Sequence, residues 1–154
     1  MAISPNTDFT SGQILTATQQ NQFPRGVMAF SSSTANFSLT TSLATTFTVT
    51  FTAVANRYYK VTYYEPQALT SNVAAQYVQT VVKNGATILN QAFLGQTAAL
   101  AKFGVIEMVA VSTFTAGSIT LTAQATSSST SGSPVLNRGA TQPAYLLVED
   151  IGPA

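Results

Sequence analysis

The sequence predicts an all-β protein, an antiparallel β-sandwich of about eight strands that is jelly-roll-like. Three observations predict it. From about residue 28 onward, apolar and polar residues alternate with a period of two, which is typical of half-buried strands. Such runs recur about every ten residues, separated by turn-forming stretches. Asn84-Gly85 lies between two apolar runs, the preferred chemistry of a type I′ hairpin. An immunoglobulin-like sandwich is the alternative, although the chain has neither the Trp nor the Cys pair that would support it.

The individual strands follow from this alternation. The run TTFTVTFTAV places Phe47, Val49, Phe51 and Ala53 on one face and threonines, which suit the solvated side, on the other. After a turn at VANR, the run YYKVTYYE alternates in the same way. Pro66 then either ends this strand or restricts it to the edge of a sheet. The remaining strands are expected in the Asn84-Gly85 hairpin (75–94), in a second hairpin through Ala116-Gly117 (103–126) and in a final strand (143–151).

The composition is poor in charge for a free monomer. Charged residues are 7% of the 154-residue chain and hydrophobic residues are 45%, whereas an ordinary domain has about 25% charged residues. Monomers usually keep their solubility through dispersed charge. The composition therefore predicts a chain covered in part by copies of itself or by other proteins. The alternative is that a face rich in Ser and Thr solvates the sandwich without charge.

Several classes of function are disfavoured. The net charge is +1, and the six basic residues are spread singly along the chain, so no clustered face for nucleic acid is expected. Without cysteine there is neither a disulfide framework nor a thiolate metal site. The N-terminus lacks the pattern of a secretory signal, and no apolar run reaches the ~18 residues of a membrane helix. We expect a chain made in a host cytoplasm, without membrane insertion.

The sequence shows no recognisable arrangement of catalytic residues. Histidine is absent, which removes the commonest general base, and without Cys the nucleophile–His arrangements are excluded. Glu149 and Asp150 are adjacent on a strand and point to opposite faces. A cross-strand pair of Glu107 and Glu149 at glycosidase spacing is the remaining option, but carboxylates on sheets are mostly solvated or paired with Lys or Arg. No Gly-rich phosphate loop occurs. We expect no enzyme, no cofactor and no metal.

The tyrosines of one strand are the binding-like feature. Tyr59 and Tyr63 share one face of the run YYKVTYYE, and Tyr58 and Tyr64 share the other. Exposed aromatic residues stack on sugars and anchor protein interfaces. Tyr58 and Tyr64 are therefore the candidate surface-binding residues, while the other two are expected in the core.

The stretch before residue 27 differs from the rest. Thr16 followed by Gln19 fits a capping box, which predicts a helix of two turns over TATQQNQF that stops before Pro24. A helix this short is not stable alone. The apolar residues around it need a surface to pack against, either their own sandwich or a neighbouring subunit. These residues are Phe9, Ile14, Leu15 and Phe23. Arg25 lies at the junction, where its charge could pair with an acidic neighbour.

The segment FTSGQILTATQQNQFPRGV resembles the N-terminal segment of small tail and other virion proteins of tailed bacteriophages, through Phe9, Thr10, Gly12, Leu15, Thr16, Ala17 and Asn21. FTAVANRYYKVTYYEP and PAYLLVEDIGPA are similar to stretches of β-sandwich domains in the same kind of protein. The resemblance implies an attachment arm (1–26) and a displayed β-sandwich (27–154), often trimeric, in a virion. It implies a tail-tip or fibre protein that touches host glycan or protein, or a capsid decoration or head-fibre protein. A free lectin-like module that binds sugar through the tyrosines is the other alternative.

Overall fold

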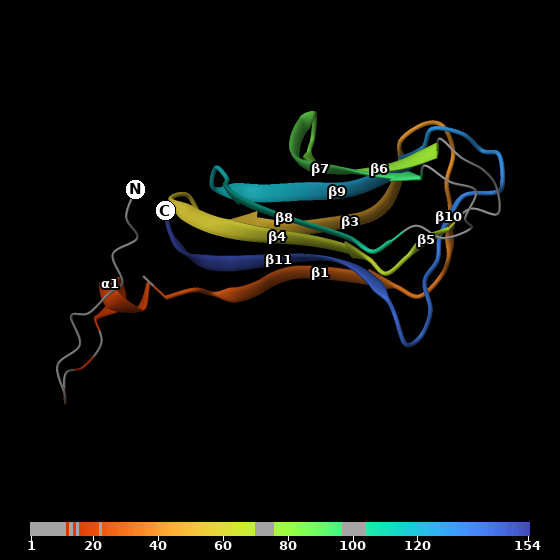
Figure 1. Ribbon diagram of the computed structural model, residues 1–154. Helices are drawn as coiled ribbons and strands as arrows, with labels where there is room; N and C mark the ends of the chain where they lie inside the picture. Colours follow the sequence, from red (N-terminus) through yellow and green to blue (C-terminus); the bar gives the residue numbers. More distant parts are fainter. Residues whose placement is uncertain (1–11, 13, 15, 22, 70–75, 97–103) are drawn as a thin grey trace.

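The computed structural model describes residues 12, 14, 16–21, 23–69, 76–96 and 104–154. These residues form two four-stranded antiparallel sheets that face each other, with a small sheet of short strands at one end (Figure 1). The first sheet has the order β1-β11-β4-β8, with the strands Gly26–Ser33, Ala144–Pro153, Arg57–Glu65 and Ile106–Thr113. The second has the order β3-β9-β6-β7, with the strands Ala44–Ala53, Gly117–Ser127, Gln76–Asn84 and Thr87–Gln96.

The two ends of the sandwich differ. At one end lie the short helix α1 (Ala17–Gln20) and the C-terminus, and at the other lies the small sheet β2-β10-β5 (Figure 1). Its strands are Phe37–Ser38, Val135–Leu136 and Ala68–Leu69. The arm therefore enters the sandwich at the end opposite the small sheet.

The strand order confirms an all-β sandwich. The first long strand, β1, lies beside the last, β11, and the second, β3, lies beside the next to last, β9. Two Greek keys wound together in a jelly roll produce this interleaving. The immunoglobulin alternative does not fit, because that fold keeps its first two strands in one sheet, whereas β1 and β3 lie in different sheets.

The core lies between the two sheets and follows the predicted alternation. Phe47, Val49, Phe51 and Ala53 of β3 are buried, and the intervening threonines at 48, 50 and 52 are exposed. From β4 of the facing sheet, the core receives three fully buried side chains, Tyr59, Val61 and Tyr63. The alternation predicted from the sequence thus places both sets of inward-facing residues correctly.

The Asn84-Gly85 turn has a different geometry from the one expected. The hairpin β6–β7 is present, but Asn84 still pairs with Thr87, so the turn residues are Gly85 and Ala86. Only Gly85, with φ of 57°, has a positive φ. A two-residue turn with a positive φ at its first position alone matches type II′ rather than type I′. The type I′ prediction is wrong because β6 continues one residue further than expected.

The second predicted hairpin is also wrong. Strand β8 pairs with β4, and β9 pairs with β3 and β6 in the opposite sheet, so the connection through Ala116 crosses between sheets. Phe114 explains the crossing: it is buried and packs against Phe51 and Tyr59, with ring centroids 5.7 and 5.6 Å apart. Burying this ring draws the chain across the end of the core.

Candidate assembly surfaces

The capping box at the start of α1 is present. The side chain of Thr16 accepts a hydrogen bond from the backbone N–H of Gln19 at 3.2 Å, and the Gln19 side chain accepts one from the N–H of Thr16 at 2.9 Å. These two bonds satisfy donors that a helix start leaves free. The helix itself covers only Ala17–Gln20, one turn rather than the two expected. It ends at the C-cap Asn21, whose backbone N–H still bonds to the carbonyl of Ala17.

A buried arginine holds the junction between the arm and the sandwich. Arg57, at the start of β4, donates hydrogen bonds at 2.6 Å to the backbone carbonyls of Asn21 and Phe23. The same guanidinium pairs with the carboxylate of Asp150 on β11 through two further bonds. Both side chains are almost fully buried. One planar group therefore ties the arm's last residues to two adjacent strands of one sheet.

The pKa of Asp150 is lowered by this arrangement. Burial acts to raise the pKa, because it penalises the charged form. The hydrogen bonds from Arg57, the backbone N–H of Gly152 and the Arg57 charge act in the opposite direction and prevail, with a further backbone bond from Arg25. Asp150 is therefore ionised at neutral pH and acts as the fixed counter-charge of Arg57.

Arg25 lies next to this ion pair. The charge that pairs with an acidic neighbour at the junction is Arg57, while Arg25 contributes a backbone hydrogen bond to Asp150. The reason is register: Arg57 lies opposite Pro153 beside the end of β11, where its guanidinium reaches inward. The exposed Arg25 lines an open hollow of about 410 Å³ together with Asn21, Asn56 and Arg57.

The arm's apolar side chains are only partly described. Ile14 is 89% exposed and Phe23 is 42% exposed, although both are large and hydrophobic. Pro24 is exposed at the exit from the arm. Phe9 and Leu15 lie outside the described residues. The sandwich of the same chain therefore leaves Ile14, two residues before the capping residue Thr16, uncovered.

The four tyrosines of β4 divide between the two sides of their sheet, as their alternation predicts. Tyr59 and Tyr63 are buried in the core, while Tyr58 and Tyr64 are half-buried on the outer side. Tyr64 stacks on Tyr145 of β11, with ring centroids 5.2 Å apart and an interplanar angle of 23°. One face of the Tyr64 ring is therefore already occupied and is not free to stack on a sugar.

Two aromatic residues on this outer side were missed by the sequence reasoning. Phe30 of β1 is 59% exposed and lies 6.1 Å from Tyr145, ring centroid to ring centroid. Tyr145 was placed within the final strand without a role, and Phe30 was not singled out. The run GVMAFSSS gave no signal for Phe30, because Val27 to Phe30 are all apolar and do not alternate, and a single strand does not show which strands are its neighbours. Only the pairing of β1 with β11 brings the rings together.

The carboxylates of the described residues do not assemble into an acid–base pair. Glu149 lies 3.4 Å from the Nζ of Lys60, and Asp150 pairs with Arg57. Glu107 lies opposite Tyr64 on β4, whereas Glu149 lies opposite Lys60, so the strand β4 separates the two glutamates. The arrangement favours the expected pairing of sheet carboxylates with Lys or Arg over a glycosidase pair.

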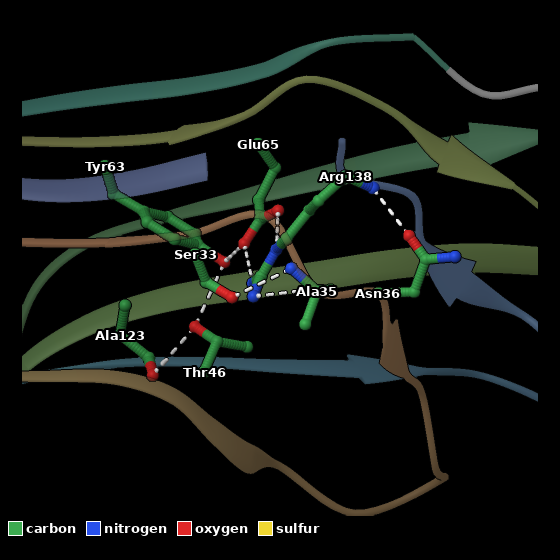
Figure 2. Close-up of polar contacts among 8 residues, drawn as sticks. All are labelled: Ser33, Ala35, Asn36, Thr46, Tyr63, Glu65, Ala123 and Arg138. Atoms are coloured by element: carbon green, nitrogen blue, oxygen red, sulfur yellow. Dashed lines mark hydrogen bonds and ion pairs between the residues drawn. The ribbon is translucent and has the colours of Figure 1, made fainter. Parts of the chain in front are cut away.

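A second buried ion pair joins Glu65 at the end of β4 to Arg138, which lies between β10 and β11 (Figure 2). The hydroxyl of Tyr63 donates to Glu65 at 2.6 Å, and the Arg138 guanidinium lies over the Phe47 ring, 4.7 Å from its centroid. Burial, then the charge and hydrogen bond of Glu65, raise the pKa of Tyr63 well above its usual value. Tyr63 therefore stays protonated as a donor, and the cluster fixes the loop around Arg138 onto the sandwich.

Within the described ranges, no three His, Cys, Asp or Glu side chains gather as metal ligands would. Across the same ranges, no helix has the length and apolarity needed to cross a bilayer.

The sequence matches no protein-family model and no curated protein. Among solved structures, the CBM22-1 xylan-binding domain of Xyn10C from Paenibacillus barcinonensis is 7% identical with a TM-score of 0.35, covering 86% of this chain and 99% of that one. A chain of the T13 particle of infectious bursal disease virus is 11% identical with a TM-score of 0.41, covering 98% and 41%. The C-terminal CBM6 of LamC from Zobellia galactanivorans is 10% identical with a TM-score of 0.31, covering 81% and 98%. Likenesses this distant carry no argument about what this chain binds.

Proposed function

We propose that this chain is a non-enzymatic structural protein of a tailed-bacteriophage virion, at the tail tip or on a fibre. Residues 1–26 attach it to the particle, and the β-sandwich of residues 27–154 is displayed on the particle surface as a homotrimer. The resemblance of FTSGQILTATQQNQFPRGV to the N-terminal arms of phage virion proteins supports placing the chain in a virion. Tyr58 and Tyr64 remain the proposed contact residues for a host surface.

The observation that carries the proposal is the exposed Ile14 on an arm whose exit is fixed. Arg57 holds the carbonyls of Asn21 and Phe23, so the arm leaves the sandwich in a defined direction. Beyond that point Ile14 is 89% exposed, next to a capped helix of one turn. A short helix with an uncovered apolar residue is stable only against another surface. Another protein of the particle supplies such a surface.

The experiment compares two substitutions that add the same charge to the arm. Ile14→Asp removes the uncovered apolar side chain, while Gln20→Asp changes an exposed polar residue in the same arm. We expect Ile14→Asp to reduce incorporation into particles at least tenfold and Gln20→Asp to leave it near the wild-type level, with equal thermal transitions for the purified proteins. Equal incorporation of the two variants would contradict attachment through the arm.

The location on the particle distinguishes the two virion alternatives. Immunogold labelling of intact particles places the chain on the tail for a tail-tip or fibre protein. Label spread over the head identifies a capsid decoration or head-fibre protein instead. A chain that is absent from particles and binds isolated glycans is a free lectin-like module, and the virion proposal fails.

A further inference from the structure

An open hollow lies where the arm meets the sandwich, at the end that holds α1 and the C-terminus (Figure 1). Its volume is about 410 Å³, which falls within the roughly 300–1,000 Å³ of pockets that take small ligands. Its walls come from the arm, from the turn between β3 and β4, from the start of β4 and from the end of β11. We call it the junction hollow.

The polar side chains of the junction hollow are suited to an anion. Two of them are the guanidinium groups of Arg25 and Arg57, and two are the carboxamides of Asn21 and Asn56. None of the described residues that line the hollow is acidic. A guanidinium group only donates hydrogen bonds, and a carboxamide can donate two. The lining therefore offers many donors to one bound group.

Arg57 has one N–H to spare within this lining. A guanidinium group has five N–H donors. Four of those of Arg57 bond to the Asp150 carboxylate and to the two arm carbonyls. The fifth, on Nη1, has no acceptor among the described residues. An anion in the junction hollow supplies an acceptor to this nearly buried side chain.

Arg25 adds a positive charge that the described part of the chain does not neutralise. The ion pairs of that part use Arg57, Lys60 and Arg138. Arg25 and Lys83 are the remaining basic side chains there, and neither has a carboxylate partner. Because Asp150 already neutralises Arg57, the junction hollow carries one net positive charge. A group with one negative charge complements it.

The backbone holds these donors in place. Arg25 is fixed at the edge of the hollow, because its backbone donates a hydrogen bond to Asp150. Asn56 has a left-handed φ of 59°, and its carbonyl accepts a hydrogen bond of 2.9 Å from the N–H of Ala154. Binding therefore orders side chains and not backbone, which lowers its entropic cost.

We propose that the junction hollow takes an acidic side chain, Asp or Glu, of the virion protein to which the arm attaches. Its carboxylate pairs with Arg25 and accepts from Arg57, since arginine and carboxylate form strong charge-assisted hydrogen bonds. The apolar part of the lining, with Val54, Ala55 and Pro153, packs against the methylene groups of the same side chain. This inference rests on the proposed attachment and names the chemistry of its partner.

The first experiment measures the binding of two short peptides to the purified protein by NMR. Acetyl-Ala-Glu-Ala-amide carries the acidic side chain, and acetyl-Ala-Gln-Ala-amide is its neutral isostere. The Glu peptide should shift the backbone amide signals of Asn56 and Arg57, with a dissociation constant at least tenfold smaller than that of the Gln peptide. Equal dissociation constants, or shifts confined to other parts of the chain, would overturn the proposal.

Two matched substitutions identify the charge responsible. Arg25→Gln removes an exposed guanidinium group and keeps the backbone bond to Asp150, so the fold should be retained. Lys83→Gln removes the other unpaired cation of the described residues, on β6 of the opposite sheet. The preference for the Glu peptide should fall below twofold in Arg25→Gln and stay at tenfold in Lys83→Gln. A preference that survives Arg25→Gln would contradict the proposal.

Inorganic phosphate separates an acidic side chain from anions in general. Phosphate has no methylene groups to pack against Val54 and Pro153, so it should bind at least tenfold more weakly than the Glu peptide. Phosphate binding as tight as that of the Glu peptide would overturn the assignment to an acidic side chain and would favour a phosphate-bearing partner.

Incorporation into particles connects the junction hollow to attachment. Arg25→Gln should lower incorporation at least tenfold, as Ile14→Asp does, and Lys83→Gln should not. If Ile14→Asp lowers incorporation and Arg25→Gln does not, the attachment stands and its acidic partner is refuted. If neither lowers incorporation while the Glu peptide still binds through Arg25, the carboxylate site stands and the attachment role is refuted.

Discussion

The guanidinium of Arg57 and the carboxylate of Asp150 form a two-bonded ion pair between β4 and β11, at the point where the arm meets the sandwich. The Nη2–Oδ1 distance is 2.7 Å, and both side chains are nearly excluded from solvent. The same guanidinium binds two carbonyls of the arm. The pair therefore stabilises the fold and fixes the arm at once, so changing it alters two measurable properties.

Arg57→Met should lower stability and release the arm. It leaves the Asp150 carboxylate buried without its counter-charge, which costs about 3–5 kcal/mol. For a chain of this size, we expect a fall of roughly 6–20 °C in the thermal transition. Tryptic cleavage after Arg25 should accelerate, because Asn21 and Phe23 lose their hydrogen bonds to Arg57. The double variant Arg57→Met/Asp150→Asn should recover most of the stability and stay sensitive to trypsin. A double variant as unstable as the single one would show that the charge pair is not the cause.

The stabilisation from Asp150 should depend on pH in the acid range. Its pKa is lower in the folded chain than in the unfolded chain, so the folded state favours the ionised form. The contribution is complete above the unfolded pKa of about 3.9 and is lost as the pH falls through the folded value. The difference in thermal transition between the wild type and Asp150→Asn should therefore shrink between pH 5 and pH 2.5. A difference that stays constant over that range would be inconsistent with an ionised Asp150.

Tyr63 should make stability fall at alkaline pH. Its pKa is raised in the folded state by burial and by Glu65, so the fold favours the protonated form. That contribution is complete below the unfolded pKa of about 10 and is lost as the pH rises above it. Tyr63→Phe should cost about 1.5–3 kcal/mol at pH 8, because a hydrogen bond to a charged group is lost. Urea midpoints at pH 8 and pH 10.5 should drop less with pH in Tyr63→Phe than in the control Tyr145→Phe. An equal drop in both would exclude this role.

Gly85 should resist substitution because of its backbone. With φ of 57°, it adopts a left-handed conformation that costs other residues about 1–2 kcal/mol. Beyond its two chain neighbours, no atom lies within 4 Å of where a Cβ would stand, so the cost of Gly85→Ala comes from the local backbone conformation and not from a tertiary clash. The control Ala86→Gly should cost under about 1 kcal/mol. Chemical denaturation of both variants tests whether Gly85→Ala loses more stability than Ala86→Gly. A stability of Gly85→Ala equal to that of the wild type would refute the turn assignment.

The residues that alternation alone determines were predictable, and those that depend on long-range pairing were not. The inward set of β3 and the division of the β4 tyrosines follow from a period of two. The crossing after β8 does not, because a strand, a short turn and another strand read alike whether the turn returns within a sheet or changes sheets. Phe114 decides it by entering the core.

The candidate site shows the same limit. The capping box of Thr16 and Gln19 is local and was predictable, whereas the Arg57–Asp150 pair joins residues 93 positions apart. Sequence reasoning assigned the junction charge to Arg25 because Arg25 is adjacent to the arm in sequence. The contact of Phe30 with Tyr145 likewise requires the pairing of β1 with β11, which no single strand reveals.

The central claim is that the arm attaches a displayed sandwich to a phage particle. Electron cryomicroscopy of intact particles, compared with particles made from a chain lacking residues 1–20, tests it most directly. This deletion keeps Asn21 and Phe23, whose carbonyls satisfy Arg57. We expect sandwich density outside the particle, with the residues around Ile14 against a neighbouring protein, and no such density with the shortened chain, which stays folded in the lysate. Particles that lack the chain, or that hold the shortened chain as well as the full one, would contradict the account.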